Sequence, residues 1–289
     1  MPHTHDAARL RACSKLLSIP LRAMPRTSSG LPHVDTTDPA QQRFQALLVS
    51  CLMSTQDQRH PLEHPSKPAF ASIGCYLNWI AVRPDRLEIH TNTACRVASR
   101  MLPQLHNGTR VSGIPGLRII DFNGVRLQLQ HLPTGARLDL VDSKEDGTRR
   151  DMKHLLGQET SWHVRKGAEP LWSQTGVTTE ETAHAHHWAA RACTPLRSAL
   201  MMRSIPLWYD LDISPAWADP LTGHPHPRLG WSGDADAQDM ADLLTKTEVR
   251  IPGAAYQARD RSRGVLTLGN GGVVLVSQPR PPRRTKSLR

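Results

Sequence analysis

The amino-acid sequence predicts an α+β fold, in which helices and antiparallel strands occupy separate stretches of the chain. Three observations point to this class: a helical pattern in the N-terminal part, an antiparallel meander near residues 117–141, and a closing hairpin near residues 264–276. The second half is expected to be largely helical, and it holds six of the seven tryptophans. Helices and strands do not alternate regularly, so a parallel sheet of βαβ units is not expected.

The N-terminal part is expected to begin with a basic, flexible segment over residues 1–37 and to continue into helices. Asp38 and Pro39 favour a helix start, because Asp caps a first turn and Pro needs no N–H partner there. Apolar residues at helical spacing predict a helix over residues 39–57, and a similar pattern predicts one over 92–105. The basic, Ser-containing start also has the composition of a mitochondrial transit peptide, which is an alternative to an ordinary basic helix.

The strand pattern is clearest in the middle of the chain. Residues 117–122 and 125–131 flank Asn123-Gly124, a pair favoured in two-residue hairpin turns, and residues 136–141 add a third strand. Apolar and polar residues alternate in the second strand, so one of its faces is expected to be buried. The side chains expected on that face are Val125, Leu127 and Leu129.

The second half is expected to share a globular core spanning residues 38–278, with a candidate domain boundary at the polar residues 143–148. Its concentration of tryptophans suggests a distinct packing region, because each buried Trp covers a large area. Thr178 and Glu181 form a capping-box pattern, which predicts a helix running to about residue 193.

A further short helix is expected over residues 194–203, ending before Ile205-Pro206 because proline breaks a helix. Residues 214–233 are rich in Pro and Gly and are expected to form a long loop. A helix over residues 236–247 and the closing hairpin complete the core.

Composition excludes several classes of protein. Five cysteines at irregular spacing form neither a disulfide framework nor a C-x-x-C zinc site, which fits a reducing compartment and predicts a cytoplasmic protein. The longest nearly apolar run, residues 70–82, is shorter than the roughly 20 residues that span a bilayer, so a soluble protein without membrane insertion is expected. Neither a G-x-S-x-G elbow nor a P-loop occurs.

Charge is concentrated at the ends of the chain. Nine of the ten net positive charges lie in residues 1–26 and 279–289, and the prolines of the second segment predict a disordered basic tail. Such a tail attracts polyanions through phosphate contacts without sequence preference, although solubilising tails have the same composition. The tail cations are Arg280, Arg283, Arg284, Lys286 and Arg289.

Residues 149–166 resemble a helix-turn-helix, with Gly157 at the turn. In this interpretation basic side chains reach phosphates, and the alternative is a short helix followed by a strand holding Trp162 and Val164. The match is poor where Lys153 and His163 replace packing residues. The basic candidates are Arg149, Arg150, Arg165 and Lys166.

Two pairs of residues are candidates for a divalent metal. His184 and His187 would share a helical face, and Asp210 and Asp212 would share one face of a strand about 6–7 Å apart. Each pair needs further ligands, and the alternatives are a solvated helix face and an acidic strand edge.

Because charge is concentrated at both ends of the chain, the leading hypothesis is a nucleic-acid-associated binding protein using basic termini. A metal-dependent enzyme and a protein-interaction module without catalysis are the alternatives.

Overall fold

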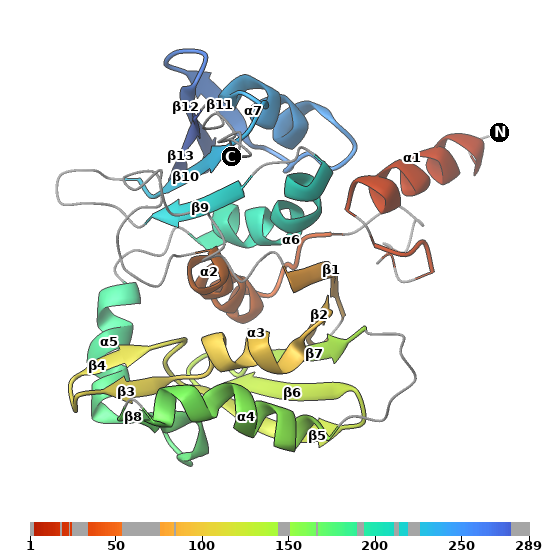
Figure 1. The fold of residues 1–289 in the computed structure, drawn as a ribbon. Coiled ribbons are helices and arrows are strands. Elements are labelled where there is room, and N and C mark those ends of the chain that lie inside the picture. Colours follow the sequence, from red (N-terminus) through yellow and green to blue (C-terminus); the bar gives the residue numbers. More distant parts are fainter. Residues whose placement is uncertain are drawn as a thin grey trace, which may run out of the picture.

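The computed structural model describes residues 3–17, 19–22, 24, 34–53, 76–83, 85–143, 151–165, 167–189, 194–210, 214–218 and 226–278. These residues form seven α-helices and thirteen strands in three sheets, which confirms the α+β class (Figure 1). Within the same ranges, no helix combines the length and the apolar character needed to cross a membrane.

The first sheet contains the expected meander. Its order is β1-β2-β7-β6-β5, formed by Leu77–Val82, Leu87–Thr91, Arg137–Asp142, Arg126–His131 and Leu117–Asn123. Strands β5, β6 and β7 pair antiparallel as predicted, and Gly124 has the positive φ of 58° that the hairpin turn requires. Strand β2 pairs parallel to β7, so the sheet is mixed. Val125 lies in the turn and is 50% exposed, so its expected burial is wrong.

One face of the first sheet is apolar and covered by a helix. Helix α3 (Ala94–Met101) packs on β2, β6 and β7, and α4 (Met152–Arg165) packs on α3. Figure 1 shows both helices on the same side of the sheet. The sheet residues buried on this side include Leu87, Ile89, Leu127, Leu129, Leu138 and Leu140. Alternation along each strand therefore places polar residues on the opposite face.

The expected helix over 92–105 is shorter than predicted. It ends at Met101, and Gln104–His106 forms β3, which pairs with β4 (Arg110–Ser112) and β8 (Ala168–Pro170) in a small third sheet. Pro103 explains the early end, because proline disfavours a helical conformation in the residue before it.

The second sheet closes the C-terminal part. Its order is β11-β12-β13-β10-β9, formed by Ala255–Ala258, Arg263–Leu268, Gly271–Gln278, Arg228–Ser232 and Ser214–Ala218. The predicted hairpin of β12 and β13 is confirmed, and so is the predicted helix before it, α7 (Ala237–Lys246). Strands β9 and β10 show that the long loop expected over 214–233 is wrong. Pro215 is compatible with β9, because this strand lies at the sheet edge, where a missing N–H is tolerated.

Helices α2 (Pro39–Met53) and α6 (Thr194–Asp210) pack against each other between the two large sheets. Asp38 caps α2 as predicted, its Oδ1 accepting from the Ala40 N–H at 3.0 Å. The expected end of α6 before Pro206 is wrong, because the helix continues to Asp210. Burial of Leu196, Leu200 and Met201 stabilises the helix enough to offset the hydrogen bond that proline removes.

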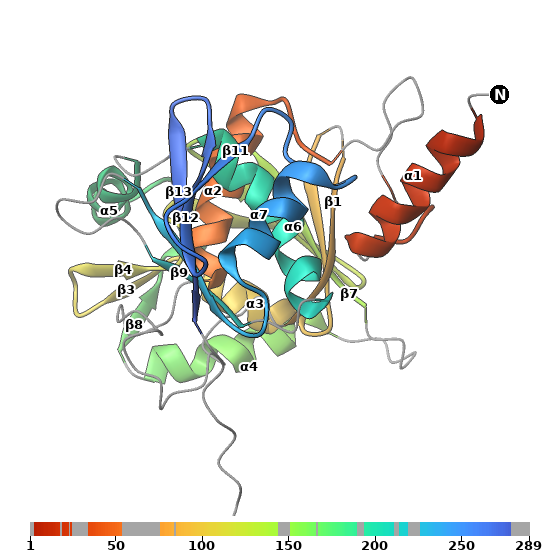
Figure 2. The same ribbon diagram turned by 90° about the horizontal axis from the view of Figure 1, so that it is seen from above.

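Part of the segment expected to be flexible is folded. Residues His3–Leu16 form α1 at the edge of the molecule (Figure 2), and Leu10, Cys13 and Leu17 are buried. These three residues belong to one hydrophobic cluster. The cluster also contains buried side chains from both large sheets, among them Leu275 of β13. The candidate boundary at 143–148 lies largely outside the described residues, as does the tail over 279–289.

Candidate nucleic-acid interface

The helix-turn-helix expected over residues 149–166 is wrong. Helix α4 is continuous from Met152 to Arg165 and runs through Gly157, so neither a turn nor the alternative strand forms there. Met152, Leu156 and Thr160 are buried at intervals of four residues, and this packing exceeds the cost of about 1 kcal/mol for a helical glycine. Arg149, Arg150 and Lys166 lie outside the described residues, as does the side chain of Arg165.

Each pair of candidate metal ligands has at least one side chain outside the described residues. His184 is half-buried in α5 (Thr179–Ala189), while the side chain of His187 lies outside the described residues. Asp210 is the last residue of α6, so the strand predicted at this position is wrong. Asp212 lies outside the described residues. In the described part of the chain, no group of three or more His, Cys, Asp or Glu residues is arranged to hold a metal ion.

The basic N-terminal residues have a defined location. Arg11 and Lys15 lie on the exposed side of α1, and Arg22 is exposed just beyond it, while the apolar side of the helix is buried. These cations therefore form part of a folded surface. The five tail cations, from Arg280 to Arg289, lie outside the described residues.

A concentration of polar side chains occurs on the side of the first sheet opposite α3. Strand alternation and the pairing register place Arg126, Arg137, Glu88, Asp139, Trp79 and His90 there, and Arg83 and Arg86 adjoin them from the β1–β2 hairpin. We call this surface, defined by these eight residues, the arginine face. It was not predicted as a site from the sequence.

Two carboxylates form the base of the arginine face. Glu88 and Asp139 are register partners in the parallel β2–β7 pair, and each side chain is only 4% exposed. Arg126 bridges them, its Nη1 lying 2.7 Å from Glu88 Oε1 and 3.1 Å from Asp139 Oδ2. Arg83 Nη2 lies 2.6 Å from Glu88 Oε2, and Arg86 Nε lies 3.0 Å from Asp139 Oδ2.

These contacts keep Glu88 ionised. Burial by itself raises the pKa of this carboxyl, but hydrogen bonds and charge from Arg126 and Arg83 outweigh burial, so its pKa lies below the ordinary value. The hydrogen bond to Glu88 also raises the pKa of Arg126. Arg83, Arg86 and Arg126 remain 33–35% exposed, so solvent meets guanidinium groups while the carboxylates lie beneath them.

Trp79 and His90 form an aromatic stack on the same face. The two residues are cross-strand partners, with ring centroids 3.4 Å apart and an interplanar angle of 13°. Burial lowers the pKa of His90 to about 4, so the imidazole is neutral at neutral pH. Its Nδ1 lies 3.3 Å from Ser143 Oγ, and this contact helps to fix the ring.

Arg137 is the most exposed cation of the arginine face. It lies on β7 two residues before Asp139, and among the described residues it has no ion-pair partner. The half-buried amides of Gln128 and Gln130 lie beside it on β6. The four arginines are balanced by four carboxylates: the buried Glu88 and Asp139, and the exposed Asp85 and Asp121, the latter on β5 in register with Gln128.

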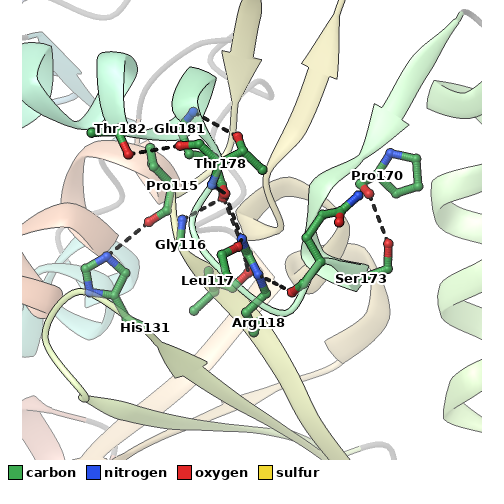
Figure 3. Close-up of polar contacts among 12 residues, drawn as sticks. Pro115, Gly116, Leu117, Arg118, His131, Pro170, Ser173, Thr178, Glu181 and Thr182 are labelled. Carbon is green, nitrogen blue, oxygen red and sulfur yellow. Dashed lines mark hydrogen bonds and ion pairs between the residues drawn. The ribbon is translucent and has the colours of Figure 1, made fainter.

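A separate ion pair closes the β5 side of the sheet. Arg118 binds Glu181 of α5, with Nη2–Oε2 at 2.7 Å and Nη1–Oε1 at 2.9 Å, and donates to the carbonyls of Gln174 and Gly176 (Figure 3). Glu181 also accepts from the N–H groups of Gly116 and Thr178. Because both charges are fully compensated, this pair holds α5 on the sheet and offers little to a ligand.

The sequence contained a partial signal for the arginine face. Polar residues at alternate positions in residues 126–130 already predicted a wet strand face. Strand β2 was not predicted, and its parallel pairing with β7 is what brings Glu88 beside Asp139. A long-range pairing of this kind has no local sequence pattern.

Comparisons with protein-family models, curated proteins and solved structures gave no match. Function is therefore inferred from the chemistry of the chain's own surface. The arginine face offers guanidinium donors and an aromatic stack on one side of a sheet, and the amides of Gln128 and Gln130 lie beside them.

Proposed function

We propose that this protein binds nucleic acid, with the arginine face contacting phosphates and the basic ends adding attraction. The observation that carries the proposal is the display of Arg83, Arg86, Arg126 and Arg137 over shielded carboxylates. Arginine suits this role because its planar guanidinium donates several hydrogen bonds to phosphate oxygens.

The buried carboxylates make the cations better suited to binding. Glu88 and Asp139 hold three guanidinium groups in place before any ligand arrives, which reduces the side-chain entropy lost on binding. Arg126 uses only Nη1 in its two ion pairs, so its other N–H groups are not engaged by the carboxylates. Phosphate can therefore be bound without breaking the ion pairs.

The chain ends support the same proposal through long-range electrostatics. The tail carries five positive charges without an acidic residue, and exposed Arg11 and Lys15 lie on α1. Each phosphate contact made by such cations releases condensed counterions, so affinity falls as salt rises. Tail binding alone has no preference for sequence or strand state.

The first test is Arg137→Gln, measured by fluorescence anisotropy with labelled oligonucleotides at about 50 and 200 mM salt. The substitution removes one exposed charge and breaks no described ion pair, so the fold is retained. We expect weaker binding to all sequences and a salt slope reduced by about 1. The matched control is Arg259→Gln, because Arg259 is an exposed arginine between β11 and β12 of the second sheet.

A second comparison separates the tail from the folded core. Removal of residues 279–289 deletes five cations and is expected to weaken binding and flatten its salt dependence without abolishing it. If the shortened protein does not bind even at the lower salt concentration, or if Arg137→Gln behaves like Arg259→Gln, the arginine face is not the interface.

A further inference from the structure

We infer that the ligand of the arginine face is a single-stranded nucleic acid whose bases stack on Trp79. This inference rests on the proposed function and adds the strand state and the stacking residue. It is carried by the Trp79–His90 stack, which lies on the same face as the exposed guanidinium groups.

The pairing register places the relevant side chains in rows across the sheet. One row contains Trp79, His90, Val141 and Arg126 on β1, β2, β7 and β6. Three strand spacings separate Trp79 from Arg126, which corresponds to roughly 14 Å. The row that holds Arg137 and Gln130 lies four residues along the strands, at roughly 13 Å. This area is large enough for several nucleotides.

The chemistry of the face favours a single strand over a duplex. Its groups are a half-buried indole, partly exposed guanidinium planes and two half-buried amides, all carried on the broad side of a sheet. The broad face of a five-stranded sheet fits the major groove of a duplex less well than a helix or a two-stranded ribbon does, whereas unpaired bases can lie flat on aromatic rings. Stacking is sequence-tolerant, because every base has a π-face.

His90 supports Trp79 in this role. The neutral imidazole lies against the indole and restricts its rotation, so the ring is positioned before a base binds. A second copy of the chain is a less suitable occupant, since Glu88 and Asp139 are buried and two such faces would bring their exposed guanidinium groups together. Single-stranded nucleic acid has complementary charge and offers the flat bases that the indole can accept.

The test uses protein lacking residues 279–289 and a 12-nucleotide labelled oligonucleotide, offered as a single strand or as its duplex. The variants are Trp79→Leu and Trp79→Phe, and the control is Trp172→Leu, a half-buried tryptophan of the short 3-10 helix Leu171–Ser173 that packs on the core. We expect the single strand to bind about tenfold more tightly than the duplex, and Trp79→Leu to lose about tenfold in single-strand affinity. Trp79→Phe, which keeps an aromatic ring, should retain most of that affinity.

The outcomes separate this inference from the proposed function. If Trp79→Leu binds the single strand as tightly as Trp172→Leu does, or if duplex and single strand bind equally, stacking is overturned. The proposed function then stands provided that Arg137→Gln still weakens binding. If the shortened protein binds neither form, both are overturned. Self-association detected by sedimentation and abolished by Trp79→Leu would identify a second copy as the occupant and overturn the inference.

Discussion

Glu181 illustrates at the residue scale how one side chain can stabilise two elements at once. The sequence predicted its capping contact, and the structure confirms it, with the Thr178 N–H donating to Glu181 Oε2 at 2.9 Å. The same carboxylate also accepts from Gly116 N–H at 2.7 Å and binds Arg118 through both oxygens. Burial raises the pKa of Glu181, but Arg118 and the two N–H donors outweigh burial, and the net pKa lies below the ordinary value.

Glu181→Gln should therefore destabilise the protein well beyond the loss of a helix cap. The substitution leaves Arg118, whose side chain is 7% exposed, without its counter-charge in a buried site. We expect a loss of about 3 kcal/mol in the free energy of unfolding, measured by urea denaturation. Glu180→Gln is the neighbouring control, since no described contact depends on Glu180. Equal effects of the two substitutions would contradict the assigned role.

At the element scale, local signals predicted helix starts better than helix and strand ends. Helix α7 has a full capping box, in which Asp236 Oδ1 accepts from the N–H groups of Gln238 and Asp239, both at 2.9 Å. The sequence predicted this helix correctly. The sequence-based prediction was wrong for α6, which continues through Pro206 because tertiary packing offsets the local cost of proline. It was also wrong for β9, which contains Pro215 and tolerates it at the edge of the sheet.

Asp236→Ala should cost about 1 kcal/mol, because it leaves two N–H groups of the first turn of α7 without their acceptor. The exposed Asp234 lies just before the helix and provides the control, Asp234→Ala. Thermal and urea unfolding followed by far-UV circular dichroism would measure both. If Asp234→Ala costs as much as Asp236→Ala, the loss reflects surface charge and not the cap.

At the scale of the whole molecule, one hydrophobic cluster joins α1, the helix pair and both large sheets. Such a shared core favours a single cooperative unfolding transition. A local change in the first sheet should therefore lower the stability of the second sheet by the same amount.

Acidification provides a test of this coupling. Burial lowers the pKa of both His90 and His131 from 6.5 to about 4, so the unfolded chain takes up protons between these values while the folded chain does not. Stability is thus fully present above pH 6.5 and is lost as the pH falls toward 4. We expect each histidine to cost about 2 kcal/mol at pH 5 relative to pH 7.

Urea midpoints measured by circular dichroism and by tryptophan fluorescence should shift together, since the two signals report on different parts of the molecule. His131→Asn should flatten the pH dependence. Separate transitions for the two probes would show that the sheets unfold independently, and an unchanged pH profile in the variant would contradict the role of His131.

Patterns in the sequence predicted the fold class, the β5–β6–β7 meander, the closing hairpin, the capped starts of α2 and α5, and the presence of helix α7. These features depend on contacts between residues close in the chain, so their signals are local. Three features became visible only in the folded molecule: α4 is one helix, Glu88 lies beside Asp139, and Trp79 stacks on His90 within the arginine face. Those outcomes depend on strand pairing and packing across long sequence separations, which no local pattern of residues encodes.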